Sequence, residues 1–172
     1  MSNRQLTPIS YVVLGLVAEG ATTSYDMKQK ASRSVGYFWN FPHSQVYAEP
    51  ARLVELGLLE EQREAEGRRR RVYTLTPAGR KTLDDWLREP TSEQPQIRDT
   101  GLLKLFFGEG LSAQEIAELA RAQEEAHRAR LAVYEQITDT VTSPNHAAVV
   151  RAGLLHERTF ADFWREVAAT PP

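Results

Sequence analysis

The four consecutive arginines Arg68, Arg69, Arg70 and Arg71 are the densest positive charge in this chain of 172 residues. A run of guanidinium groups attracts phosphates and can neutralise the backbone of a nucleic acid. The same run can instead be a solvated strand edge, whose charge discourages pairing with other chains. The predicted elements on either side of the run indicate which of these two interpretations is favoured.

The other residues that could do chemistry form no catalytic or metal-binding pattern. The four histidines have no metal-ligand spacing, and His156-Glu157 lacks the second histidine of a zinc-protease helix. The adjacent pair Glu124-Glu125 is typical of a solvated helix face. Glycine-rich phosphate loops, nucleophile elbows and cysteines are all absent from the sequence. We therefore expect a protein that is not an enzyme, with no metal site and no cofactor.

A predicted helix and hairpin position the arginine run. Apolar residues at Val46, Leu53, Leu56 and Leu59 have helical spacing, and Gly57 suits the left-handed position after a helix end. Pro50 lies inside this helix, so we expect a kink there or a first segment that is partly 3₁₀.

Two strand-like segments follow, at residues 58–64 and 70–76, and Ala65-Glu66-Gly67 joins them as a turn. In the second strand, Val72 and Thr74 face one way and Tyr73 and Leu75 the other. A helix followed by a basic hairpin suits DNA, because the major groove admits a helix and the phosphates attract arginines.

Helix-start signals mark the elements around this unit. Thr7-Pro8 and Thr76-Pro77 each combine a capping residue with a proline at the first helical position. Ser24 is predicted to cap a second helix from Tyr25 to Ser34. Helix, turn, helix, linker, helix and hairpin together predict a winged helix-turn-helix over residues 1–90.

The first helix has a broad apolar face and could pass for a signal peptide, but it starts at a proline, has a single basic residue, Arg4, ahead of it, and leads into a polar amphipathic helix. The sequence has no membrane span of about 20 apolar residues. We expect a cytoplasmic protein that does not contact membranes.

The charge is distributed unevenly between the two halves. The net charge of the chain is −2, but residues 1–90 carry 13 basic against 11 acidic residues, whereas residues 91–172 carry 8 against 12. The positive balance therefore belongs to the half that contains the predicted hairpin, as a local nucleic-acid footprint requires.

Residues 91–172 are predicted to be a helical domain. Thr91–Gln96 is a polar linker, Ser112 and Glu115 form a capping box for a long helix to about Thr140, and Ser143-Pro144 begins a last helix to about Ala169. Two such amphipathic helices have too little surface for a core of their own, so they need the first domain or a second subunit.

The apolar residues of the last helix are the predicted dimer contacts. They are Leu154, Phe160, Phe163, Trp164 and Val167. The aromatic members of this set could instead line a pocket for a small hydrophobic ligand at the dimer interface, although a plain dimer core is the simpler interpretation.

Residues 9–87 resemble the PadR family of transcriptional regulators. The matching segments are Tyr25-Asp26-Met27, Phe38-Trp39, Ser44-Gln45-Val46-Tyr47, Arg52-Leu53, Gly57-Leu58-Leu59 and Arg71-Val72-Tyr73-Thr74-Leu75-Thr76-Pro77-Ala78-Gly79. Residues 97–169 resemble the longer PadR subfamily, whose C-terminal region is similar to virulence-activator proteins. The chain departs from the family at Pro50, where many members have leucine.

The resemblance implies a mainly α (α+β) fold and a homodimer that binds an operator with one winged helix per subunit, usually to repress. Carried over by position, Gln45 would read a base, while Ser44 and Tyr47 would contact the DNA backbone. Ser24 and Tyr25 would touch phosphate at the start of the second helix. The remaining candidate DNA contacts are His43, Arg52 and the four arginines of the hairpin.

These contacts have alternatives, as has the function itself. Tyr47 could pack in the core, and Ser24 and Tyr25 could simply cap a helix. The leading hypothesis is a dimeric DNA-binding regulator with a possible small hydrophobic effector. The alternatives are a winged-helix protein-interaction module without operator binding, and a binder of hydrophobic small molecules whose DNA role is vestigial.

Overall fold

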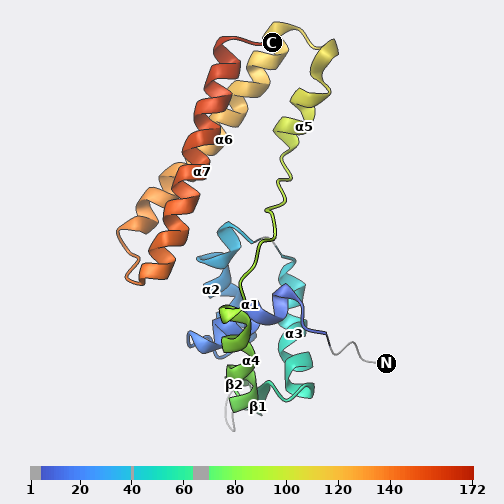
Figure 1. Cartoon of the computed structure of the whole chain (residues 1–172), viewed down its shortest axis with the longest axis vertical. Coiled ribbons are helices and arrows are strands. Elements are labelled where there is room, and N and C mark those ends of the chain that lie inside the picture. The colour runs from blue at the N-terminus through green and yellow to red at the C-terminus, as the bar shows by residue number, and fades with distance from the viewer. Residues whose placement is uncertain (1–4, 40, 64–69) are drawn as a thin grey trace. The chain divides into compact units, whose positions relative to one another are not determined.

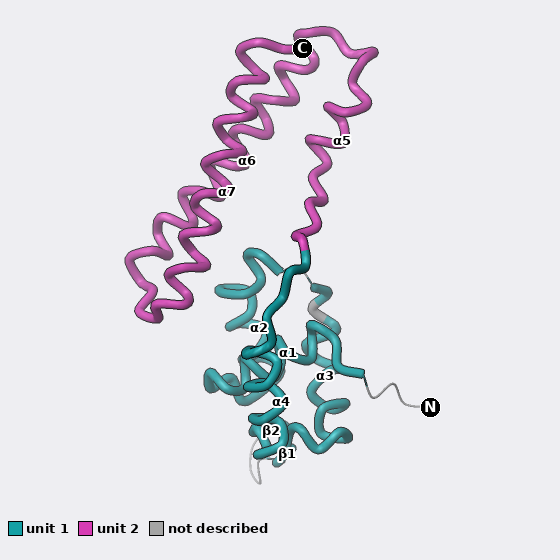
Figure 2. The backbone as a smooth tube through the Cα atoms, in the orientation of Figure 1, with its two compact units in different colours: residues 1–93 teal, residues 94–172 magenta. Residues whose placement is uncertain are grey.

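The computed structural model describes residues 5–39, 41–63 and 70–172, without the side chain of His43 (Figure 1). Its α-helices and strands are α1 (Pro8–Ala18), α2 (Ser24–Ser32), α3 (His43–Glu55), β1 (Leu59–Arg63), β2 (Arg71–Leu75), α4 (Pro77–Arg88), α5 (Thr100–Phe106), α6 (Ala113–Thr138) and α7 (Pro144–Ala169), with 3₁₀ helices η1 (Val35–Tyr37) and η2 (Gly108–Gly110). The chain forms two compact units, residues 1–93 and 94–172 (Figure 2). The fold is mainly α with a two-stranded wing, as predicted.

Most of the predicted helix starts are confirmed. α1 begins after Thr7 and α4 after Thr76, whose hydroxyl accepts a hydrogen bond of 2.9 Å from the Gly79 amide. The start of α2 is one residue earlier than predicted, because Thr23 rather than Ser24 is its cap. Both residues can accept the capping hydrogen bond, but only Thr23 has an acidic partner three residues later, at Asp26.

The core of the first unit lies between α1, α2 and α3. Its fully buried side chains include Val13, Leu14, Met27, Val46 and Leu53. The helices therefore meet through apolar faces that the helical spacing of the sequence specifies.

α3 is α-helical from His43 to Glu55 and includes the fully buried Pro50. The predicted 3₁₀ segment at its start is therefore wrong, whereas a bend at Pro50 stays a prediction. Gly57 follows the helix with φ +70°, the left-handed conformation that glycine adopts most easily and that we expected here.

The wing is an antiparallel pair of strands, in register from Leu59 opposite Leu75 to Arg63 opposite Arg71. Both strands are shorter than the predicted segments, and the predicted turn Ala65-Glu66-Gly67 lies outside the described residues. Tyr73 is buried, and its amide donates a hydrogen bond of 2.8 Å to the Thr22 carbonyl. This hydrogen bond ties the wing to the turn that precedes α2.

The second unit consists mainly of the antiparallel pair α6 and α7, which lie side by side along most of their lengths (Figure 1). The predicted capping box of Ser112 and Glu115 begins α6. The helices approach closely at Gly153, where a Cβ atom would lie 2.5 Å from the Tyr134 ring. Residues 89–99, between α4 and α5, contain no helix or strand. Within the described parts of the chain, no helix is both long and apolar enough to cross a membrane.

Candidate nucleic-acid interface

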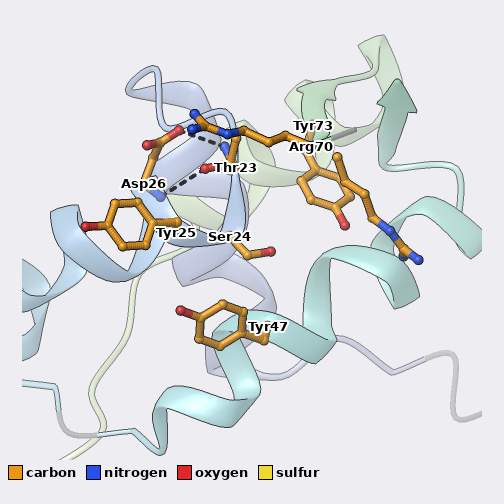
Figure 3. Close-up of a pocket in the computed structure, with 8 residues that line it drawn as sticks. Thr23, Ser24, Tyr25, Asp26, Tyr47, Arg70 and Tyr73 are labelled. Carbon is orange, nitrogen blue, oxygen red and sulfur yellow. Dashed lines mark hydrogen bonds between the residues drawn. The ribbon is translucent and has the colours of Figure 1, made fainter. Parts of the chain in front are cut away.

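Three elements of the first unit surround one surface hollow of about 820 Å³ (Figure 3). The start of α2 contributes residues Thr23 to Asp26, and α3 contributes Tyr47. The wing contributes Arg70, Arg71 and Tyr73. The helix, the neighbouring helix start and the basic wing that were predicted separately therefore open onto one shared surface.

A capping box holds the start of α2 in place. The Asp26 amide donates to the Thr23 hydroxyl over 3.1 Å, and the Thr23 amide donates to the Asp26 carboxylate over 3.0 Å. The hydrogen bond from the Thr23 hydroxyl is the main cause that lowers the pKa of Asp26, with further hydrogen bonds from the Thr23 amide and from Thr22. The Asp26 carboxylate is thus engaged in hydrogen bonds at the start of its own helix.

Ser24 and Tyr25 lie beside this cap without forming it. Ser24 lines the hollow, and the hydroxyl of the exposed Tyr25 accepts a hydrogen bond of 2.8 Å from the side-chain amide of Gln29. Simple capping therefore does not explain Ser24, because Thr23 has that role. Phosphate contact by Ser24 and Tyr25 stays a prediction.

The first turns of α3 present their polar residues to solvent. Ser44 and Gln45 are exposed. Val46, the next residue, is fully buried. Tyr47 is 48 % exposed and lines the hollow, which does not fit the alternative that it packs in the core. Of His43, only the backbone is described, at the start of the helix.

The described arginines of the wing have only weak ties within the protein. Arg71 lies 3.5 Å from the Glu61 carboxylate in an exposed ion pair, and Arg70 is exposed and lines the hollow. Exposed ion pairs contribute little and exchange easily for other anions. Arg68 and Arg69 lie outside the described residues.

Arg52 has different surroundings from the other candidate DNA contacts. Its guanidinium donates to both carboxylate oxygens of Glu49, over 2.7 and 3.0 Å, and to the Ser10 hydroxyl over 2.9 Å. Arg52 is not among the residues that line the hollow. The residue therefore joins two helices in this structure.

The predicted dimer contacts differ in how much surface they can offer. Trp164 is fully buried within its own chain, so its ring has no surface left for a partner. Phe163 is 37 % exposed, and Leu154, Phe160 and Val167 are half-buried. The α6–α7 pair thus has a small core of its own, which the sequence did not lead us to expect.

The sequence did not single out Thr23, Asp26 and Tyr73 as members of this surface. The spacing of Thr23 and Asp26 is that of a capping box with aspartate as the acid, and this signal could have located the helix start. Nothing local to Tyr73 predicts that it lies beside α2. Among the described residues, no group of three or more histidine, aspartate or glutamate side chains could hold a metal ion.

Comparisons with known proteins match both units. Residues 13–85 match the model of the "Transcriptional regulator PadR-like family", and residues 97–170 match that of "Virulence activator alpha C-term". The chain is 28% identical to the negative transcriptional regulator PadR of Bacillus subtilis, over 94% of this chain and 96% of that one. It is 27% identical to the probable transcriptional regulator Rv1176c of Mycobacterium tuberculosis, over 90% and 78% of the two chains.

Solved structures agree with this match. The structure of Bacillus subtilis PadR in complex with operator DNA has a TM-score of 0.84 at 27% identity, and covers 95% of this chain and 98% of that one. The Vibrio cholerae virulence activator AphA has a TM-score of 0.71 at 29% identity, over 94% and 96% of the chains. The two family matches, the winged helix and the full-length likeness agree with one another. The chain therefore belongs to the PadR-like family of DNA-binding transcriptional regulators, which are not enzymes, and it carries the C-terminal region of virulence activators.

Proposed function

We propose that the chain binds a pseudo-palindromic operator as a homodimer and represses the genes that follow it. The observation that carries this proposal is the hollow that α2, α3 and the wing share. A duplex that lies on this surface would meet polar side chains of α3 in its groove, and arginines at its phosphates. The 28% identity to a regulator described as negative supports repression.

Each contact in the proposal has a distinct role. Gln45 reads an adenine with its amide, and Ser44 and Tyr47 hold the helix on the DNA backbone. Ser24 and Tyr25 contact phosphate at the start of α2, where the helix dipole favours an anion. His43 and the arginines Arg68 to Arg71 add contacts around them, and the arginines contribute affinity that is independent of sequence.

The second unit supplies the dimer in this proposal. Phe163 is exposed, Leu154, Phe160 and Val167 are half-buried, and a second copy of α7 would cover all four. Two-fold symmetry then gives two winged helices that meet half-sites about one helical turn or more apart.

A small hydrophobic or aromatic effector would release the DNA. The support is a likeness to the Bacillus subtilis PadR structure in complex with p-coumaric acid, at 26% identity and a TM-score of 0.76. An effector that binds the DNA-free form more tightly shifts the population away from the operator complex.

The test is fluorescence anisotropy with labelled DNA from upstream of the protein's own gene, against random DNA of equal length. We expect tighter binding to the upstream DNA, and loss of that preference when p-coumaric acid, but not acetate, is added. Equal binding to both DNAs would favour the protein-interaction module. Tight binding of p-coumaric acid by a chain without DNA preference would favour the small-molecule binder.

A further inference from the structure

A buried polar network joins the first turn of α1 to the middle of α3. Ser10, which is fully buried, donates a hydrogen bond of 2.7 Å to the Glu49 carboxylate. Arg52 donates to the same carboxylate oxygen over 2.7 Å, to the other over 3.0 Å, and to the Ser10 hydroxyl over 2.9 Å. The three side chains therefore form a closed ring of hydrogen bonds between two helices.

The hydrogen-bonding capacity of the Ser10 hydroxyl is fully used. It donates to Glu49 and accepts from Arg52, and it also accepts a hydrogen bond of 2.9 Å from the Thr7 amide. Glu49 is 9% exposed, and a carboxylate so far from water requires a charged partner. The hydrogen bond with Glu49 is the main cause that raises the pKa of Arg52, so the guanidinium stays charged. Removal of the Arg52 guanidinium would leave the buried Glu49 carboxylate with only the Ser10 hydroxyl of this network as a partner.

The network spans a weak point of α3. Pro50 has no amide hydrogen, so the Val46 carbonyl cannot receive its usual helical hydrogen bond from that residue. Glu49 lies immediately before the proline and Arg52 lies two residues after it, and their side chains are joined by two hydrogen bonds. The ion pair thus joins the residue before Pro50 to a residue of the turn after it, next to the missing backbone bond, and Ser10 attaches both side chains to α1.

The exposed residues of α3 that belong to the candidate DNA surface lie before this point. Ser44, Gln45 and Tyr47 precede the proline, whereas the buried anchor Leu53 follows it. A change of angle at Pro50 would therefore move the groove-facing residues, together with the buried Val46 among them, relative to the part of α3 that follows the proline. A base contact depends on such angles far more than a phosphate contact does.

We infer that Ser10, Glu49 and Arg52 are positioning residues that hold the first turns of α3 at a fixed angle across Pro50, and that they thereby set the preference for operator over random DNA. This inference rests on the proposed operator binding. Arg52 is then a side chain that shapes the reading surface without contacting phosphate.

Two substitutions of opposite charge separate positioning from phosphate contact. We expect Arg52→Ala and Glu49→Gln each to lower the preference for upstream over random DNA by roughly tenfold, about the loss of one base contact. The slope of log affinity against log salt on random DNA should not change. If Arg52 bound a phosphate, Arg52→Ala would flatten that slope by about one unit, and Glu49→Gln would strengthen binding to both DNAs.

The conservative variant and the double variant sharpen the test. Arg52→Lys keeps the charge but lacks the planar guanidinium that makes two parallel hydrogen bonds to the carboxylate, so it should lose most of the preference. A phosphate contact would instead tolerate lysine. The double variant Glu49→Gln/Arg52→Ala should be no worse than the worse single variant, because both changes break one network. Independent losses that add together would overturn the inference.

Controls distinguish this inference from misfolding and from the failure of operator binding. Glu55→Gln changes an exposed carboxylate of the same helix and should keep the preference. Amide hydrogen exchange in residues 43–49 should quicken in the variants while exchange in β1 and β2 is unchanged. Should Arg52→Ala fail to fold, Ser10→Ala removes one hydroxyl and provides the same comparison. Wild-type protein without any preference would reject the proposed function, whereas variants that keep the wild-type preference would reject the positioning role alone.

Discussion

Arg71 and Arg52 belong to the same unit but lie in opposite surroundings. The side chain of Arg71 is 53% exposed and lies 3.5 Å from a partly covered carboxylate, whereas that of Arg52 is 26% exposed and donates hydrogen bonds to both Glu49 and Ser10. The first can exchange its partner for a phosphate at little cost, and the second cannot. Residue type alone therefore does not assign a DNA contact, since burial and existing partners decide it.

The first prediction concerns the wing. Replacement of Arg68, Arg69 and Arg70 by alanine should weaken binding to all DNA sequences alike, because phosphate contacts carry no sequence information. The slope of log affinity against log salt should fall by about one unit for each lost contact. As a control of equal charge, Arg128, Arg158 and Arg165 on α6 and α7 are replaced together. An unchanged slope in the wing variant would show that the run only keeps a strand edge solvated.

The second prediction concerns base reading by Gln45. Gln45→Ala should lower affinity for the operator by about 1–3 kcal/mol while random DNA binds as before. The control is Gln114→Ala, on an exposed position of α6, which should change neither affinity. Similar losses on operator and random DNA would make Gln45 a backbone contact. Titration of both DNAs by anisotropy at one salt concentration provides the measurement.

The helix starts show how far local sequence can predict the elements of this fold. Thr7-Pro8, Thr76-Pro77 and the Ser112–Glu115 pair begin helices where expected, because a cap satisfies its hydrogen bonds within four residues of chain. Ser24 was wrongly predicted as the cap of α2 in place of Thr23, because either of the two adjacent hydroxyls can accept the capping hydrogen bond. The alternative of a 3₁₀ start for α3 was wrong, since the helix is α-helical from His43 and includes the fully buried Pro50.

Contacts between residues far apart in the sequence could not be predicted from such local patterns. The Ser10–Glu49 hydrogen bond joins residues 39 positions apart, and the burial of Trp164 depends on how closely α6 and α7 approach. The capping and periodicity patterns describe single elements, whereas these contacts need two. The candidate DNA surface was accordingly predicted in its parts, with Arg52 included and Tyr73 omitted.

The third prediction concerns the packing of α4. A Cβ atom at Gly79 would overlap the Leu58 carbonyl, whereas one at Gly15 in α1 would meet nothing within 4 Å. Gly79→Ala should therefore lower the free energy of unfolding of the first unit by roughly 1–3 kcal/mol, through displaced backbone. Gly15→Ala is the matched control and should raise it by about 0.5–1 kcal/mol, since alanine favours helix. Urea titration followed by circular dichroism compares them, and equal effects would contradict this packing.

At the scale of the whole molecule, the proposed homodimer is supported by aromatic side chains that are exposed in the single chain. Phe106 and Phe107 at the end of α5 are 78% and 74% exposed, and Phe163 on α7 is 37% exposed. Exposed aromatic side chains of this size favour association with a partner surface. A homodimer in which two identical surfaces meet is the simplest way to cover them.

The fourth prediction tests this assembly. A chain truncated before Pro144 lacks α7 and should be a monomer or an aggregate, with little operator affinity although its wing is intact. Loss of the second half-site contact should be responsible, because each winged helix alone makes only half of the contacts. Sedimentation velocity of the full chain at micromolar concentration is the direct measurement. A monomeric full chain would remove the basis for a two-fold operator.

The burial of Trp164 makes the chain a spectroscopic reporter of its own two units. The chain has three tryptophans, of which Trp164 is fully buried in the second unit, while Trp39 and Trp86 in the first are 44% and 43% exposed. Indole emission shifts to longer wavelength when water reaches the ring. Loss of the short-wavelength component should thus follow unfolding of the α6–α7 pair. A Trp164→Phe variant, which should lack the short-wavelength emission, assigns that component to Trp164. In the unchanged chain, the urea concentration at which half of this emission is lost shows whether the helical unit unfolds before or with the winged helix.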